Sequence, residues 1–154
     1  MKVGVVLAAG AAAFAVWVAP SAGTPGACKP GQRTVGGTTI VVHCGPAKAT
    51  VKVGGKTYQI FGGTCGWKPS AALYMVDVGI QSLNSKQPRA RYLGVRSSHR
   101  RGGTYTNVAV AFQVNRTGYT LGRSTVTISR DLERGSFSGD LLFGVGSAKG
   151  SWTC

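Results

Sequence analysis

The carboxylates come first, because a pair of them could act as general acid and general base. The chain of 154 residues has four Asp and Glu residues in total. Asp131 and Glu133 fall in one predicted turn, and Asp140 lies in the strand that follows. Glycoside hydrolysis needs two carboxylates that face each other, and this spacing does not predict such a pair. Asp77 lies between Val76 and Val78 in an apolar strand, and alternation could point it outward. If it points inward it needs a basic partner, because an unpaired buried charge is costly.

The histidines offer a second kind of chemistry, in which an imidazole activates a neighbouring nucleophile. His43 is adjacent to Cys44. However, adjacent residues of a strand point to opposite faces of the sheet, and a cysteine of an exported protein is expected to be oxidised. His99 lies in a polar loop, where a solvated side chain is the simplest interpretation. We therefore predict no catalytic residue and no enzyme activity.

Neither a metal site nor a cofactor site is predicted. A structural zinc site needs ligands at short spacing, and the sequence has no Cys-x-x-Cys or His-x₃-His motif. The glycine-rich residues 62–66 lack the Gly-Lys-Ser/Thr of a phosphate-binding loop and precede no predicted helix. We therefore expect no bound metal and no cofactor.

The N-terminus determines how the four cysteines are interpreted. Lys2 precedes an uncharged apolar run, and small residues follow up to Gly23, which is the layout of a secretory signal peptide. We predict a signal peptide at residues 1–23 and a secreted protein; the alternative is a protein held at the cell envelope by an uncleaved N-terminal segment or by a lipid. In an oxidising compartment four cysteines are expected to form two disulfides. Three pairings are possible among Cys28, Cys44, Cys65 and Cys154.

The composition is typical of β structure, with one Glu and many β-branched Val and Thr residues. Residues 49–53 and 56–61 alternate around a Gly-Gly pair, which predicts a β-hairpin, since both turn positions need φ > 0. Further strands are expected at residues 38–43, 73–80, 90–96, 104–114, 119–121, 125–130, 136–143 and 147–154. We predict one all-β domain at residues 38–154, an antiparallel β-sandwich or barrel-like fold stapled by two disulfides, after a flexible lead-in at residues 24–37.

The charge is strongly unbalanced, with a formal net charge of +14. A basic excess attracts polyanions in a salt-dependent way, so an anionic cell-wall polymer or a membrane surface is the expected partner of a monomeric protein. No motif indicates specific nucleic-acid recognition. One short segment is especially basic, and we predict that it contacts the anion through Arg89, Arg91, Arg96, Arg100 and Arg101.

Four short motifs occur in a distinctive order, at residues 49–56 (ATVKVGGK), 61–65 (FGGTC), 135–139 (GSFSG) and 150–154 (GSWTC). This order resembles the actinobacterial lipoprotein antigen family of the LpqH type, over about residues 47–154. The resemblance implies a small exported β domain on the cell envelope, without known enzyme activity, and with a disulfide that matches Cys65 and Cys154.

The sequence departs from that family at its N-terminal cysteine. A lipoprotein needs a Leu-like residue three positions before the lipidated cysteine, and Pro25 stands three positions before Cys28. We therefore do not expect lipid anchoring at Cys28, and predict instead that it pairs with Cys44.

These observations favour a non-catalytic exported protein, secreted or envelope-associated, that acts by surface contact. One alternative is a secreted inhibitor or ligand-binding module that uses the loop at residues 82–89 or the loop at residues 97–103. A second alternative is a polyanion-binding basic protein.

Overall fold

The computed structural model describes residues 28–84 and 87–154; the predicted signal peptide and residues 24–27 of the predicted lead-in lie outside these ranges. The described chain folds into strands joined by turns, with a single 3-10 turn, η1 (Pro69–Ala71). The strands are β1 (Gly31–Val35), β2 (Thr38–Val42), β3 (Lys48–Val53), β4 (Lys56–Phe61), β5 (Gly63–Lys68), β6 (Leu73–Ser82), β7 (Arg91–Ser97), β8 (Gly103–Thr106), β9 (Ala109–Val114), β10 (Thr117–Ile128), β11 (Arg134–Leu141) and β12 (Ser147–Thr153).

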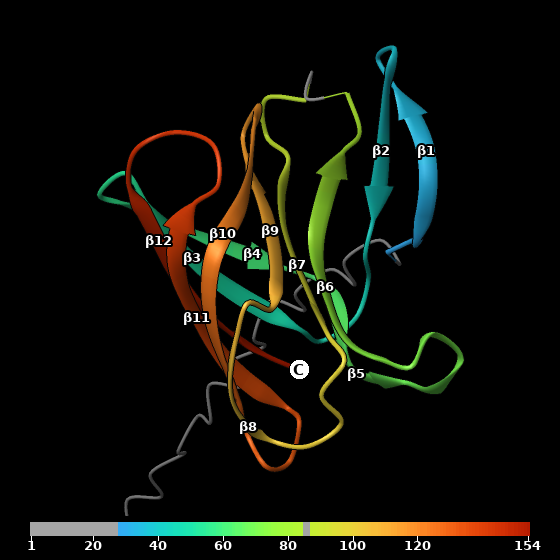
Figure 1. Ribbon diagram of the computed structural model, residues 1–154. Helices are drawn as coiled ribbons and strands as arrows, with labels where there is room; N and C mark the ends of the chain where they lie inside the picture. The colour runs from blue at the N-terminus through green and yellow to red at the C-terminus, as the bar shows by residue number, and fades with distance from the viewer. Residues whose placement is uncertain (1–27, 85–86) are drawn as a thin grey trace, which may run out of the picture.

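All strands belong to one antiparallel sheet that stays open and does not close into a barrel (Figure 1). The order along the sheet is β1-β2-β6-β7-β9-β10-β11-β12-β3-β4, with β5 paired to β6 and β8 paired to β10 outside this path. This confirms the prediction of a single all-β antiparallel domain.

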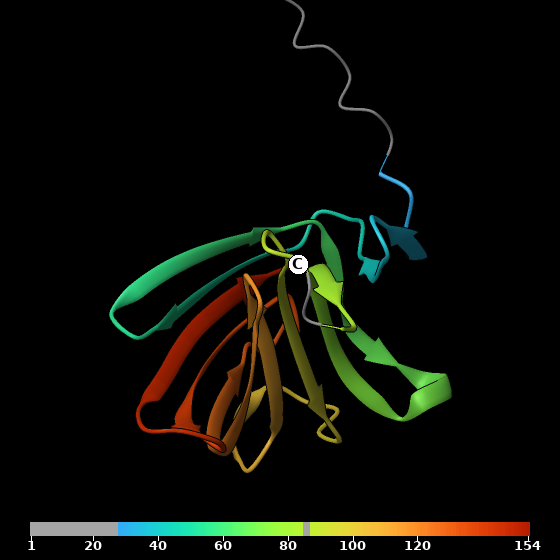
Figure 2. The ribbon, with the colours of Figure 1, turned by 90° about the horizontal axis from the view of Figure 1, so that it is seen from above.

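Strand β10 is where the sheet turns from one half into the other. Its first residues pair with β9, whereas its later residues pair with β11 and β8, and the register shifts between Leu121 and Arg123. Seen from above in Figure 2, the strands follow a curve, and the β3–β4 hairpin lies across the open side. Strand β4 consequently contacts β6 and β7, and the sheet encloses a core.

The core is formed by alternate residues of the strands, because successive side chains of a strand point to opposite faces. Its largest buried side chains are Trp152, Tyr74, Phe112, Ile60, Leu93 and Ile128. They come from both halves of the sheet, so the two halves bury one common apolar interior.

The predicted strands are confirmed at the Gly-Gly hairpin and differ from the structure at two later places. The predicted Gly54-Gly55 hairpin is confirmed, with φ values of 55° and 75° at the two glycines. The single strand expected at residues 104–114 is wrong: the chain breaks into β8 and β9 at Asn107, which has a φ of 57°. The two strands expected at residues 119–121 and 125–130 are one strand, β10, because the register shift absorbs the irregular residues between them.

Two strands appear where none was expected. Strand β1 lies in the predicted flexible lead-in, and all five of its residues are exposed, so no alternation marks it. Strand β5 pairs only with β6. It contains glycines, and its residues do not alternate between buried and exposed, so no alternation marks it either.

Both predicted disulfides are present, Cys28–Cys44 and Cys65–Cys154, with Cα–Cα distances of 5.9 and 5.5 Å. No cysteine is left free. Paired cysteines indicate an oxidising environment.

Candidate functional site

The five arginines predicted to contact an anion lie in three separate places. Arg89 and Arg91 lie at the start of β7 and are exposed. The Arg91 guanidinium donates a hydrogen bond to the carbonyl oxygen of Gln59 at 3.3 Å and lies 5.7 Å from the ring centre of Tyr58. Arg91 therefore already holds β4 against β7.

Arg96 forms an ion pair on the outer face of the sheet, where Nη2 lies 2.6 Å from Oδ1 of Asp77. The same carboxylate oxygen accepts a hydrogen bond from the Tyr92 hydroxyl at 2.7 Å. Burial alone would lower the pKa of Arg96, but the hydrogen bond and the charge of Asp77 outweigh burial and raise it. Burial and the Asp77 carboxylate likewise raise the pKa of Tyr92. Asp77 thus points to the outer face, between the buried Val76 and Val78, and its basic partner Arg96 is neutralised.

His43 completes this cluster, with its ring stacked on Tyr92 at a centroid distance of 5.4 Å. Its buried Nε2 atom has no hydrogen-bond partner among the described residues. Burial lowers the pKa of the imidazole, and the nearby Arg96 adds to that effect while Asp77 opposes it. Because Cys44 is bonded to Cys28, His43 has no thiol beside it to activate.

Arg100 and Arg101 lie in the loop between β7 and β8, at the other end of β7. The Arg100 guanidinium lies 5.5 Å from the Trp67 ring centre, and the Arg101 carbonyl accepts a hydrogen bond from the Tyr105 hydroxyl at 2.7 Å. The ring of His99 packs on Tyr105, with 3.7 Å between centroids. The five arginines therefore do not form one continuous surface, because β7 separates its two ends and Arg96 between them is paired with Asp77.

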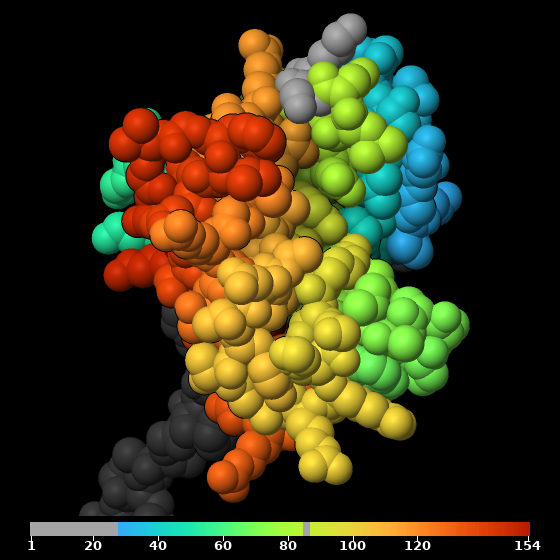
Figure 3. All heavy atoms as spheres, viewed as in Figure 1, coloured from blue at the N-terminus to red at the C-terminus, as the bar shows by residue number. Residues whose placement is uncertain are grey.

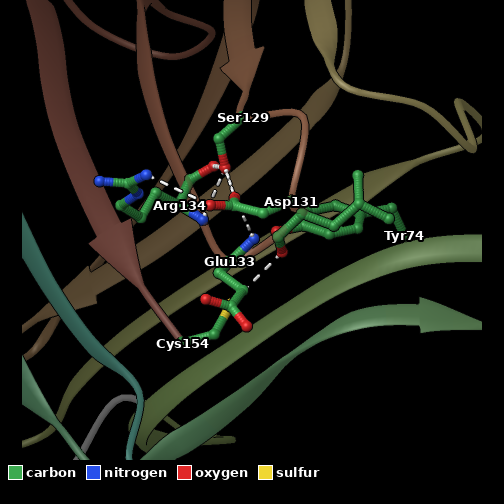
Figure 4. A network of polar contacts seen from close by, with 7 residues as sticks. Tyr74, Ser129, Asp131, Glu133, Arg134 and Cys154 are labelled. Carbon is green, nitrogen blue, oxygen red and sulfur yellow. Dashed lines mark hydrogen bonds and ion pairs between the residues drawn. The ribbon is translucent and has the colours of Figure 1, made fainter.

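The acidic residues between β10 and β11 build the turn that joins these strands (Figure 4). Asp131 accepts hydrogen bonds from the Ser129 hydroxyl and from the Glu133 amide, and its Oδ2 lies 3.2 Å from Nη2 of Arg134. These bonds hold the pKa of the exposed Asp131 carboxyl below its ordinary value, the Ser129 hydroxyl contributing most. The Cys154 amide donates to the Glu133 carbonyl at 2.7 Å, so this turn also holds the C-terminal cysteine.

A different surface brings polar side chains together, on the outer face of the half formed by β8, β10, β11, β12, β3 and β4. Strand pairing aligns its side chains in two rows. The first row contains Thr104, Thr127, Ser136, Ser151, Thr50 and Gln59. The second row contains Thr106, Thr125, Ser138, Lys149, Lys52 and Thr57. We call these two rows the hydroxyl–lysine face.

All but one of these side chains are exposed, and the exception, Thr50, is half-buried. Thr104 and Thr127 lie with their hydroxyl oxygens 3.0 Å apart, which shows how closely neighbouring members of a row approach. At about 4.8 Å between strands, six strands span about 24 Å. The face is therefore wide enough for several units of a polymer.

The centre of the face is a pair of lysines. Lys52 of β3 and Lys149 of β12 are directly opposite each other in the register. No carboxylate of the described residues lies within 4.0 Å of either ammonium group. Two adjoining hollows of about 470 and 480 Å³ share Lys52, Ser138 and Lys149 in their linings. The second hollow also reaches Asp140, the one acidic side chain beside the lysines.

This face was not predicted from the sequence, although a local signal exists. Lysine and hydroxyl residues recur at every second position in residues 48–52, 125–127, 136–138 and 149–151. A period of two marks one face of a strand. What the pattern does not show is that these four segments are neighbours.

Comparison with protein-family models, with curated proteins and with solved structures gives no match for this chain. Within residues 28–84 and 87–154, no three His, Cys, Asp or Glu side chains are grouped so that they could hold a metal ion. The same residues include no helix with the length and apolar character that a membrane crossing requires.

Proposed function

We propose that this protein is exported and binds an anionic polysaccharide on its hydroxyl–lysine face. The observation that carries the proposal is the pairing of Lys52 with Lys149. Like charges directly opposite each other on neighbouring strands are destabilising. An anionic group bound between the two ammonium groups would remove this repulsion.

The surroundings of the two lysines suit a sugar polymer. Hydroxyl groups of Thr50, Ser138 and Ser151 adjoin them in the rows, and each can donate and accept hydrogen bonds. Sugar hydroxyls need such partners, while the ammonium groups meet the carboxylate, sulfate or phosphate of the polymer. An extended polymer could lie along a row across the strands.

The charge of the whole chain supports the same proposal. Only two ion pairs, Arg96–Asp77 and Arg134–Asp131, neutralise basic residues in the described ranges. The unbalanced positive charge speeds encounter with a polyanion. Binding to an anionic polymer of the cell envelope would keep an exported protein at the surface without a lipid anchor.

The secreted-inhibitor alternative has less support. A rigid loop enclosed by disulfides would favour it, but neither Cys28–Cys44 nor Cys65–Cys154 joins the two sides of the loop at residues 97–103 or of the described part of the loop at residues 82–89.

The experiment compares two variants with the same loss of charge. Lys52→Gln/Lys149→Gln alters the proposed site. Arg100→Gln/Arg101→Gln alters the loop between β7 and β8, outside that site. On immobilised heparin, used as the probe, we expect the lysine variant to elute at clearly lower salt than the arginine variant. Equal elution of the two variants would contradict the proposal and indicate that only the net charge matters.

A further inference from the structure

The loop between β11 and β12 exposes large apolar side chains in a single short segment. Leu142, Phe143 and Val145 lie at its tip; Phe143 is 82% exposed and Val145 fully exposed. We call residues 142–145 the β11–β12 tip. Figure 3 shows this loop (red) standing at the surface of the molecule.

Backbone hydrogen bonds attach the base of the tip to the sheet. The Leu141 amide donates to the Gly146 carbonyl at 3.0 Å, and the Leu142 amide donates to the Thr120 carbonyl of β10 at 2.8 Å. The Leu142 side chain lies over Gly122, where a Cβ atom would meet it. The base of the tip and the Leu142 side chain are thus held against β10.

Further apolar side chains share the end of the molecule at which the tip lies. The β1–β2, β6–β7 and β9–β10 turns lie at the same end in Figure 1. Val35, the last residue of β1 before the first turn, and Leu83 of the second turn are each about half exposed, at 45% and 51%. This end therefore carries several exposed apolar groups, of which Phe143 and Val145 of the tip are the most exposed.

The charged residues around the tip are mostly basic. Arg123 follows Gly122, and Arg116 lies in the β9–β10 turn; both are exposed. Lys56 is exposed beside the β3–β4 turn, and β3 pairs with β12 up to Ala148. The one acidic residue near the tip is Asp140, which is opposite Arg123 in the register.

We propose that the β11–β12 tip inserts into the surface of a membrane that contains anionic phospholipids. A convex tip of three side chains is too small for a stable protein interface, which buries about 800 Å² on each partner. A lipid layer, in contrast, takes up apolar side chains to a depth of about 5–10 Å, and basic residues beside them meet the phosphates. This inference does not depend on the polysaccharide site, since the tip has none of the hydroxyl–lysine face residues.

The test uses vesicles of phosphatidylglycerol and phosphatidylcholine with the oxidised protein. We expect Phe143→Ser/Val145→Ser to reduce the fraction of protein that sediments with the vesicles at least tenfold. Phe61→Ser is the matched control, because Phe61 is also exposed, at 61%, but lies at the other end of the β3–β4 hairpin from its turn. All variants have the same N-terminus, so a difference between them reports on the tip.

A second variant, Phe143→Trp, measures insertion directly. Brominated acyl chains should quench its additional fluorescence, relative to the unmodified protein, and the emission should shift to the blue on vesicle binding. Retained binding of Phe143→Ser/Val145→Ser, or a Phe143→Trp signal that bromine does not quench, would overturn the inference. So would a concentration-dependent dimer that the double variant abolishes while no protein binds the vesicles, because a second copy would then cover the tip.

Discussion

The indole of Trp152 and the phenol of Tyr74 are hydrogen-bonded inside the core, with Nε1 of Trp152 3.1 Å from the Tyr74 hydroxyl oxygen. The Tyr74 hydroxyl in turn donates to the Leu132 carbonyl at 2.9 Å. These bonds connect β6 in one half of the sheet with β12 and the β10–β11 turn in the other. Removal of the hydroxyl would leave a buried donor and an acceptor unpaired.

We therefore expect Tyr74→Phe to lower the free energy of unfolding by about 1–3 kcal/mol, as measured by urea denaturation. Tyr119→Phe is a suitable control, because Tyr119 is only partly buried at the edge of the core. An unchanged midpoint for Tyr74→Phe would show that water replaces the lost hydrogen bonds.

His43 should make stability dependent on pH. Its pKa lies below the ordinary value of 6.5, so between these two values the unfolded chain binds more protons than the folded protein. Stability should therefore be fully present above about pH 6.5 and fall as the pH is lowered toward the folded pKa.

His43→Phe keeps an aromatic ring on Tyr92 and removes the titration. We expect it to lose less stability than the unmodified protein between about pH 8 and about pH 5.5, a window chosen to lie above the titration of ordinary carboxylates. Denaturant midpoints at both pH values provide the measurement. If both proteins respond to pH equally, His43 does not control the response.

The two disulfides should differ in their contribution to stability. Cys28–Cys44 spans 16 residues and Cys65–Cys154 spans 89. The loop-entropy model gives about 3 kcal/mol for the first and about 4.5 kcal/mol for the second. We expect Cys65→Ser/Cys154→Ser to lower the thermal midpoint more than Cys28→Ser/Cys44→Ser. The reverse order would mean that β1 and β2 contribute more than their exposed surface indicates.

The hydroxyl groups of the proposed site can be removed without changing charge. Thr125→Val/Thr127→Val keeps the β-branched shape that the strand favours, at two exposed positions. We expect several-fold weaker binding of the anionic polysaccharide, measured by calorimetry, with an unchanged unfolding midpoint. The control is Thr64→Val, because Thr64 is exposed and lies on β5 in the other half of the sheet. Thr38 is unsuitable for this purpose, since it is buried. Equal affinity of all three proteins would restrict the site to the lysines.

The sequence predicted those elements in which one face of a strand is buried. The β3–β4 hairpin is the clearest example, because Val51 and Val53 alternate with exposed residues and two glycines mark the turn. Strand β1 could not be found in this way, since its side chains are all exposed and it is held by pairing with β2 alone.

The candidate site was harder to predict, because it depends on register between distant segments. Lys52 and Lys149 become neighbours only when β12 pairs with β3, and no local sequence pattern predicts that pairing. The arginine segment shows the converse: Arg96 and Arg100 are close in sequence, but the first is paired with Asp77 and the second lies on Trp67.

The positions of the two disulfides also define how the domain would respond to a pulling force. A tension applied between Cys28 and Cys154 would pass through the bonds to Cys44 and Cys65 and load only the segment between them, the β3–β4 hairpin. Full extension of that segment would lengthen the molecule by no more than about 70 Å, whereas the reduced chain could extend to roughly 440 Å. Oxidation thus converts an extensible chain into a short tether, in which β3 would have to separate from β12, and the Lys52–Lys149 pair would be lost, before the segment reached that length.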